Sequence, residues 1–358
     1  MTPLSAIPPI EPAEGPVGRR TIAVSDGARN GRTLVVDVWY PAAVNAAGAA
    51  GAGGSPPLTW YEPIPGVRFE SANAHDDAAV APGAYPLIIL SHGRTGMRFA
   101  YALLCEALAA RGAIVAAPDH VGDVMTDWLG GTFADDRTNE VNRVGDSGFL
   151  IDCLLDPASQ PGVAAIADVL RTIDHSKIAS IGHSYGAYTA LAAAAGVRGV
   201  PPDDRIGAVI GIQPYTRTMS DAALERIHTP TLLILSEFDT TAPPATDGDR
   251  PWALIPAPTV WRLDLLRAAH HASSDMGLYL ELAARIPDLP PMVAAYVAMM
   301  TPDMFGEHLR PWREGLLVQL RVIWAFLDVT LHIDETRGEN EAARLAATPG
   351  VVLTRRWP

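Results

Sequence analysis

The sequence predicts an α/β fold with a mostly parallel central sheet that helices cover on both faces. Two observations predict this class. Short, continuous apolar runs, which are typical of strands buried on both faces, alternate with longer segments of helical periodicity. Helices between successive strands also supply the long connections that parallel strands require. The expected strands are residues 32–41, 85–93, 113–119, 177–182, 205–212, 229–237 and 259–265.

The elements follow in order along one predicted domain, residues 1–358. The first strand, "RTLVVDVWYP", stops at Pro41, which has no backbone N–H to donate. Residues 42–84 are predicted to be an irregular insertion, because they begin with a stretch of small residues that cannot build a core. Strands and helices then alternate. The expected helices are residues 97–112, 138–156, 162–173, 185–196, 220–227 and 315–331.

Composition excludes several classes of function. The formal net charge is −13, with 27 Lys and Arg against 40 Asp and Glu and no long basic run, so nucleic acid is not an expected partner. Neither a membrane span nor a secretory signal is visible, which predicts a cytoplasmic protein unless a leader was removed. Cys105 and Cys153 lie in apolar, helix-like segments and are expected to be buried free thiols, although a disulfide between them is not ruled out by the count.

The stretch "SIGHSYGAYTAL" carries the first indication of chemistry. It places Ser184 between two glycines, directly after an expected strand and directly before an expected helix. In parallel sheets, ligands bind beyond the carboxyl ends of the strands, which is where this serine falls. A serine on such a strand-to-helix turn is a candidate nucleophile, provided that an acid and a histidine follow in that order.

The later strands offer both partners. Asp239 comes just after the strand 229–237 and is the expected acid, with Glu237 as its competitor. His270 and His271 follow the strand 259–265, and the spacing alone does not choose between them as the base. A histidine would take the serine proton, and a carboxylate would fix its tautomer and stabilise the imidazolium.

An oxyanion requires two backbone N–H donors. The expected pair is the N–H of Tyr185, which follows the serine, and that of Arg94 in "SHGRTG" after the strand 85–93. No cofactor is implied. A metal has no support either, because the chain lacks C-x-x-C and H-E-x-x-H motifs.

Taken together, these segments resemble the α/β-hydrolase superfamily. Within it, the chain is similar to the group of platelet-activating-factor acetylhydrolases, bacterial polyester-cleaving cutinases and predicted dienelactone hydrolases. The resemblance spans roughly residues 16–275 in pieces. The segments that carry it include "VDVWYPA", "YPLIILSHG", "LAARGAIVAAPDH", "SKIASIGHSYGAYTAL", "PTLLILSEFDTTAP" and "AAHHASSD".

The resemblance implies roles for particular positions. An Asp five residues after the base is common in the group, and Asp275 has this spacing from His270, which favours His270 over His271. The acetylhydrolases place their acid one strand earlier, near Gln213, which cannot serve, so the cutinase-like position of Asp239 is expected instead. Residues 276–312 read as an added helical insertion that forms a lid or acyl-pocket wall, or alternatively extra core or a homodimer surface.

The sequence therefore predicts a serine carboxylic ester hydrolase that acts on a small or medium ester through an acyl-enzyme. Its catalytic residues would be Ser184, His270 and Asp239. Two alternatives remain at this point. One is a non-catalytic binding protein of the same fold. The other is a peptidase or acyltransferase that uses the same three residues.

Overall fold

The computed structural model describes residues 4–7, 14–43, 56–64, 67–158, 160–272 and 274–357. Across these ranges, one twelve-stranded sheet has the order β1-β5-β2-β3-β7-β6-β8-β9-β10-β11-β12, with β4 paired to β5. The strands are β1 (Leu4–Ile7), β2 (Val17–Asp26), β3 (Arg32–Pro41), β4 (Leu58–Ile64), β5 (Val67–Asp76), β6 (Tyr85–Ser91), β7 (Ile114–Pro118), β8 (Ile173–His183), β9 (Ala208–Ile212), β10 (Thr231–Ser236), β11 (Val260–Leu265) and β12 (Val351–Arg356).

The centre of the sheet is parallel, as predicted. Strands β7, β6, β8, β9, β10 and β11 all pair in parallel, whereas β3 joins this block antiparallel on one side and β12 on the other. Strand β6 lies between β7 and β8, so the chain leaves β6 to one side and returns on its other side. The loops after β6 and β8 therefore separate at a topological switch point, which is the usual place for a ligand.

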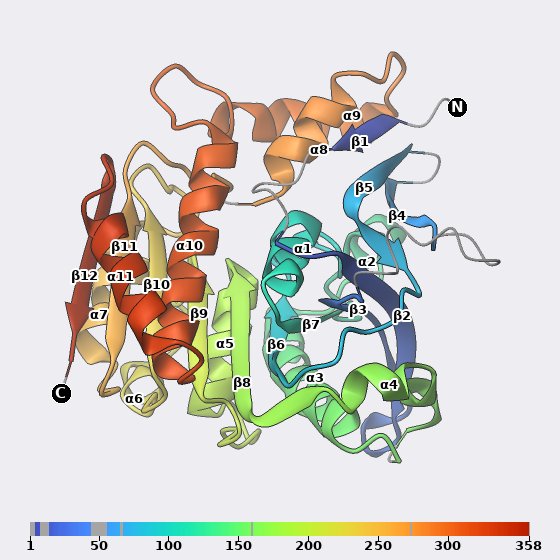
Figure 1. The fold of residues 1–358 in the computed structure, drawn as a ribbon. Helices are drawn as coiled ribbons and strands as arrows, with labels where there is room; N and C mark the ends of the chain where they lie inside the picture. The colour runs from blue at the N-terminus through green and yellow to red at the C-terminus, as the bar shows by residue number, and fades with distance from the viewer. Residues whose placement is uncertain are drawn as a thin grey trace.

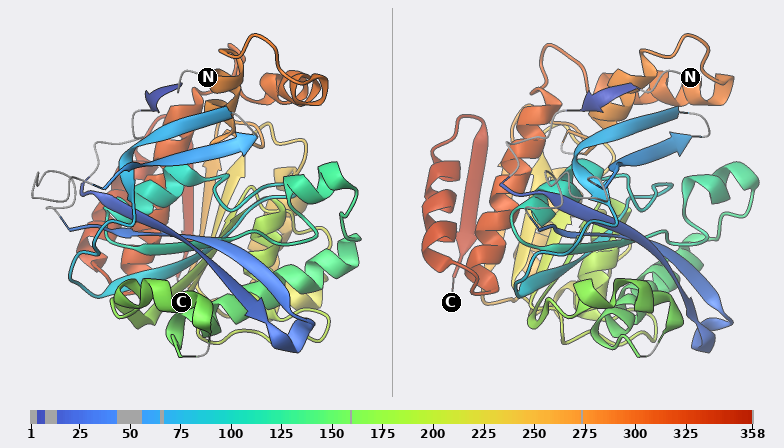
Figure 2. Two further views of the ribbon diagram at one scale, coloured as in Figure 1. Left: turned by 90° about the vertical axis from the view of Figure 1, so that its right-hand side faces the viewer. Right: turned by 45° about the vertical axis from the view of Figure 1, so that its right-hand side comes forward.

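Helices cover both faces of the sheet (Figures 1 and 2). Helices α1 and α10 pack in one apolar cluster, and α3 and α5 pack in the other. The helices are α1 (Ala102–Ala110), α2 (Met125–Gly130), α3 (Asp136–Leu155), α4 (Ala167–Leu170), α5 (Tyr185–Ala195), α6 (Asp221–Leu224), α7 (Asp249–Leu254), α8 (Met276–Ala283), α9 (Pro291–Met300), α10 (Trp312–Thr330) and α11 (Glu335–Ala346).

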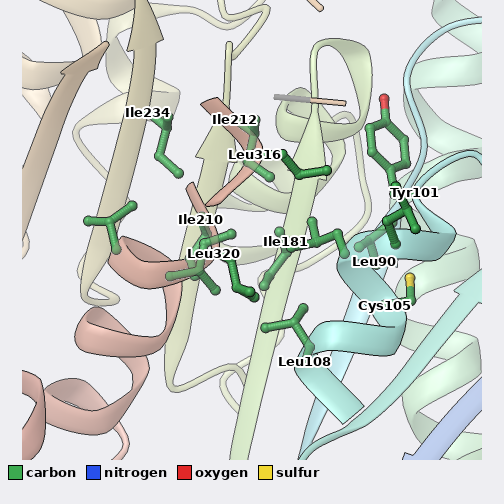
Figure 3. Close-up of a cluster of buried hydrophobic side chains, with 14 of the residues drawn as sticks. Leu90, Tyr101, Cys105, Leu108, Ile181, Ile210, Ile212, Ile234, Leu316 and Leu320 are labelled. Atoms are coloured by element: carbon green, nitrogen blue, oxygen red, sulfur yellow. The ribbon is translucent and has the colours of Figure 1, made fainter. Parts of the chain in front are cut away.

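Strand periodicity explains the two clusters. Along β6, Leu87 and Ile89 belong to the cluster with α5, whereas Ile88 and Leu90 belong to the cluster with α1. Successive side chains of a strand point to opposite faces, so a strand covered on both faces is apolar throughout. Figure 3 shows the face of the sheet that α1 and α10 cover, where Leu90 lies against α1. Burial on both faces is the physical reason that the parallel strands could be predicted from continuous apolar runs.

The prediction of an irregular segment over residues 42–84 is wrong in part. Strands β4 and β5 occupy residues 58–64 and 67–76 and pair with each other, and β5 also pairs with β2. Residues 44–55 of that segment lie outside the described residues. Residues 162–173, expected to form one helix, instead form a 3₁₀ turn, the short α4 and the start of β8. The strands β2 and β12 were not foreseen.

The two cysteines, Cys105 on α1 and Cys153 on α3, are buried free thiols, as expected. None of the helices in the described ranges is long and apolar enough to cross a membrane. Helices α8 and α9, which follow β11, lie along the edge of the sheet toward which β8 points (Figure 1). This position brings the segment 276–312 over the carboxyl ends of the parallel strands.

Candidate active site

Ser184 occupies a tight turn between β8 and α5. Its backbone has φ 55° and ψ −118°, a strained conformation for a residue with a side chain, and its N–H donates to the carbonyl oxygen of Ile212 at 2.8 Å. The flanking glycines are sterically required. A Cβ atom on Gly182 would lie 2.0 Å from the carbonyl oxygen of Gly186, and one on Gly186 would lie 2.0 Å from that of Ser91. The turn thus holds Ser184 above the carboxyl end of the sheet.

The structure brings Ser184, His270 and Asp239 into one hydrogen-bonded line. The Nε2 atom of His270 is 2.9 Å from the Oγ atom of Ser184, and its Nδ1 atom is 2.7 Å from Oδ2 of Asp239. A carboxylate only accepts, so Nδ1–H donates to Asp239 and Nε2 is left to accept the serine proton. The His270 and Asp239 residues are 3% and 4% exposed, which shields this line from water.

Backbone amides hold the carboxylate in place. The second oxygen of Asp239, Oδ1, accepts from the N–H groups of Thr241 at 2.9 Å and Ala242 at 2.7 Å. Both carboxylate oxygens therefore have defined partners, and Oδ2 is the one that accepts from the imidazole of His270. The competing acid, Glu237, is exposed and accepts from the backbone N–H of Arg267 at 2.8 Å. Gln213, at the acetylhydrolase-like position, donates to the hydroxyl of Ser236 at 2.9 Å.

His271 packs beside the line rather than in it. Its ring meets that of His270 edge-on, with 4.9 Å between the centroids, and lies 5.5 Å from the ring of His183. Burial, together with the neighbouring His270 and His183, lowers the pKa of His271 well below its usual value. The structure thus places His270 against Ser184, and His271 lines the cavity next to it.

His183 is a buried residue that the sequence indicated only as part of a turn. Its Nε2 atom is 2.9 Å from the backbone oxygen of His270, and its Nδ1 atom is 2.7 Å from the hydroxyl of Tyr101. A carbonyl oxygen only accepts, so Nε2 carries the proton and Nδ1 accepts from Tyr101. Burial and the nearby His270 lower the pKa of His183 to about 3, so it stays neutral.

The loop after β6 reaches the same cavity. Gly93 and Arg94 line it together with Ser184 and His270. Tyr185 is the first residue of α5, so its N–H belongs to the group of helix N-terminal donors that have no acceptor within the helix. The Arg94 guanidinium is ion-paired with Asp136 and lies over the Tyr185 ring at 5.3 Å. Both expected oxyanion donors thus lie on segments that border Ser184.

Buried polar side chains hold this loop from beneath. The Nδ1–H of His92 donates to the carbonyl oxygen of Gly93 at 2.7 Å, and its Nε2 accepts from the N–H of His120 at 3.2 Å. The Arg143 guanidinium donates to the carbonyl oxygen of His92 and to Asp123 at 2.8 Å. These partners come from α3 and from the loop after β7, so their roles could not be read from local sequence.

A second Ser-His-Asp line exists, and its burial distinguishes it from the first. His120 Nδ1 lies 3.0 Å from Asp146, and His120 Nε2 lies 3.1 Å from the hydroxyl of Ser91. All three residues are 0% exposed, and none of them lines the cavity. Burial lowers the pKa of His120 to about 4. With no route for a substrate, this second line is part of the core beneath the loop.

The cavity above Ser184 has a volume of about 380 Å³. Most of its wall is apolar, and α2, α8 and α9 contribute many of the lining residues. A pocket of a few hundred Å³ with apolar walls and a few polar groups at one end suits a small organic ligand. No group of His, Cys, Asp and Glu in the described ranges is arranged to hold a metal ion.

Comparisons with known proteins agree with this architecture. The ferulic acid esterase from Streptomyces cinnamoneus has a TM-score of 0.65 and 21% identity, with 92% of this chain and 93% of that chain covered. The chain has the α/β-hydrolase fold. The sequence profile of platelet-activating factor acetylhydrolase, isoform II, matches residues 69–140 of this chain.

Two curated relatives of the chain are platelet-activating factor acetylhydrolases. The platelet-activating factor acetylhydrolase of Cavia porcellus is 25% identical over 182 residues, and that of Canis lupus familiaris is 27% identical over 184 residues. Each match covers 43% of this chain and 40% of the relative, so it spans about two fifths of the relatives' length. The α/β-hydrolase fold that the sequence predicts is confirmed.

Proposed function

We propose that this protein is a serine hydrolase that cleaves carboxylic esters through an acyl-enzyme intermediate. The observation that carries the proposal is the line from Asp239 through His270 to Ser184, which ends in an apolar cavity. In this line the acid fixes the base, and the base accepts a proton from a hydroxyl that a ligand can reach. The names of the similar proteins, an esterase and acetylhydrolases, agree with ester cleavage.

The first half of the reaction acylates the serine. Ser184 Oγ attacks the ester carbonyl carbon while its proton moves to Nε2 of His270, and Asp239 stabilises the resulting imidazolium. The N–H groups of Arg94 and Tyr185 donate to the oxyanion that develops. Tyr185 begins α5, so the positive end of the helix dipole adds to this stabilisation. The tetrahedral intermediate collapses, and His270 returns the proton to the departing alcohol.

The second half releases the acid. Water attacks the acyl carbon, and His270 Nε2 takes its proton and then gives it to Ser184 Oγ as that atom leaves. No metal or redox cofactor enters either half of this scheme. The segment 276–312 contributes α8 and α9 to the wall above the serine, and we infer that it encloses the substrate rather than serving as a homodimer surface.

A binding protein without activity is a weaker explanation. Ser184 holds a strained backbone conformation, and such strain persists where a function requires it. One oxygen of the Asp239 carboxylate orients the buried His270, and the other accepts hydrogen bonds from two backbone N–H groups. Binding alone does not need this degree of organisation. A peptidase or acyltransferase would use the same groups on a different acyl donor or acceptor.

A labelling experiment tests the proposal. Wild-type protein and the Ser184→Ala variant are incubated with a fluorophosphonate probe, and their hydrolysis of p-nitrophenyl butyrate is measured. We expect labelling at Ser184 by mass spectrometry in the wild type alone, and a loss of at least about a thousandfold in turnover in the variant. Undiminished hydrolysis by folded Ser184→Ala protein would refute the proposal. Amine and alcohol acceptors added to the same assay separate hydrolysis from acyl transfer.

A further inference from the structure

Methionine is concentrated around the cavity. At least six of the nine methionines of the chain line it. They come from the loop after β6, from α2, from α8 and from α9, so the concentration is not a property of one helix. They are Met97, Met125, Met276, Met292, Met299 and Met300. Methionine is unbranched and polarizable, and it fills irregular space and adapts to ligands of different shapes.

Two of these methionines are open to solvent. Met292 and Met299 on α9 are 55% and 63% exposed, and Trp128 on α2, which lines the same cavity, is 48% exposed. Large apolar side chains gathered around one opening mark a surface that a ligand covers. In the wall of the same cavity, the hydroxyl of Tyr279 on α8 is fixed by donation to the carbonyl oxygen of Phe99 at 2.9 Å. The wall therefore combines a fixed side chain with adaptable ones.

The cavity is also nearly free of charge. Among the described residues that line it, Arg94 is the one with a charged side chain, and its guanidinium is already paired with Asp136. His183 and His271 are neutral because burial lowers the pKa of each imidazole. Transferring a charged group into such a wall has a large desolvation cost that no free counter-ion would offset.

We propose that the cavity binds the hydrocarbon part of uncharged esters and adapts to its shape through the methionines, so that linear and aromatic acyl groups are both accepted and anionic ones are excluded. This inference rests on the proposed ester hydrolysis. It adds the chemical class of the substrate: neutral esters of medium-length aliphatic acids and of simple aromatic acids.

A substrate series tests the class. We measure kcat/KM for the p-nitrophenyl esters of acetic, butyric, hexanoic, octanoic and benzoic acid, and for the anionic hemisuccinate. Each buried methylene should raise kcat/KM about three- to fourfold over the first members of the series. The hemisuccinate should be roughly a hundredfold slower than the butyrate. A flat or falling response to chain length, or a hemisuccinate as fast as the butyrate, would overturn the inference.

Matched variants test the role of the methionines. The triple variant Met292→Ile, Met299→Ile, Met300→Ile keeps the wall apolar but replaces flexible side chains with ones that are stiff at χ1. We expect its ratio of kcat/KM for hexanoate to that for benzoate to change by about tenfold or more. The control is Met304→Ile, because Met304 is buried close to α9 but does not line the cavity, and its ratio should stay at the wild-type value. An unchanged ratio in the folded triple variant would contradict the role of the methionines.

A binding measurement separates this inference from the proposed function. The Ser184→Ala variant is titrated calorimetrically with ethyl butyrate, hexanoate, octanoate and benzoate, none of which needs to react. Dissociation constants that fall with chain length support the cavity assignment even if no ester is hydrolysed. Labelling of Ser184 together with dissociation constants that do not change with chain length would refute the inference and leave the proposed function intact.

Discussion

The Nε2 atom of His183 lies 2.9 Å from the backbone oxygen of His270, the residue that contacts Ser184. Tyr101 directly precedes α1, and its hydroxyl donates to Nδ1 of His183 at 2.7 Å. All three residues are buried. The two hydrogen bonds tie the loop that carries His270 to the strand that carries the serine. We infer that His183 and Tyr101 are positioning residues.

Removing the Tyr101 hydroxyl should therefore affect turnover more than substrate binding. In Tyr101→Phe the ring still lines the cavity, but Nδ1 of His183 loses its donor. The imidazole whose Nε2–H donates to the carbonyl oxygen of His270 is then held less firmly. We expect kcat to fall about tenfold with little change in KM. Tyr279→Phe is the matched control, since it deletes a hydroxyl from the same cavity whose partner is Phe99. Equal losses of kcat in the two variants would contradict the positioning role.

The two adjacent histidines should differ sharply. His270→Ala removes the proton acceptor, so we expect kcat to fall at least about a thousandfold. His271→Ala removes a packed neighbour whose ring is 4.9 Å away, so a loss of about tenfold or less is expected. Steady-state kinetics on both proteins, with circular dichroism to confirm folding, make the comparison. A near-total loss at His271 with a mild loss at His270 would reverse the assignment.

The acid can be tested with a substitution that keeps its shape. In Asp239→Asn an amide replaces the carboxylate beside Nδ1 of His270 and favours the wrong tautomer, so kcat should fall about ten thousandfold. Glu237→Gln is the control, because Glu237 is exposed and accepts from the N–H of Arg267. Its kcat should stay close to that of the wild type. A mild effect at Asp239 with a severe one at Glu237 would move the acid to Glu237.

The sequence predicted those parts of the molecule in which local chemistry dictates structure. The parallel strands could be recognised because both of their faces are buried, as in β6 and β10. The turn at Ser184 could be recognised because backbone atoms leave no room for a side chain at Gly182 or Gly186. The candidate acid Asp239 and the two candidate bases, His270 and His271, followed from the order of elements on a parallel sheet, where successive loops reach the same edge.

What the sequence did not indicate depends on contacts between distant residues. Tyr101 and His183 are 82 residues apart, and neither has a neighbour in the sequence that marks the pairing. Strand β5 lies near the edge of the sheet and reads as mixed polar sequence, so no continuous apolar run indicates it.

Acid should destabilise the fold through its buried histidines. Burial lowers the pKa of His120 to about 4, so this imidazole is neutral in the folded protein between pH 4 and about pH 6.5 but protonated in the unfolded chain. The unfolded state binds more protons in that window, and the contribution of His120 to stability, present above about pH 6.5, is lost as the pH falls toward 4.

Urea unfolding at pH 7 and pH 5 measures this contribution. Between pH 7 and pH 5, protonation of His120 in the unfolded chain should by itself lower the free energy of unfolding by about 2 kcal/mol. The variant His120→Gln cannot be protonated there, so its free energy of unfolding should fall about 2 kcal/mol less than that of the wild type. The variant His228→Gln, which removes a histidine from an exposed position between α6 and β10, is the control and should show the wild-type decrease. If His120→Gln loses as much stability as the wild type between the two pH values, His120 is not held neutral in the fold.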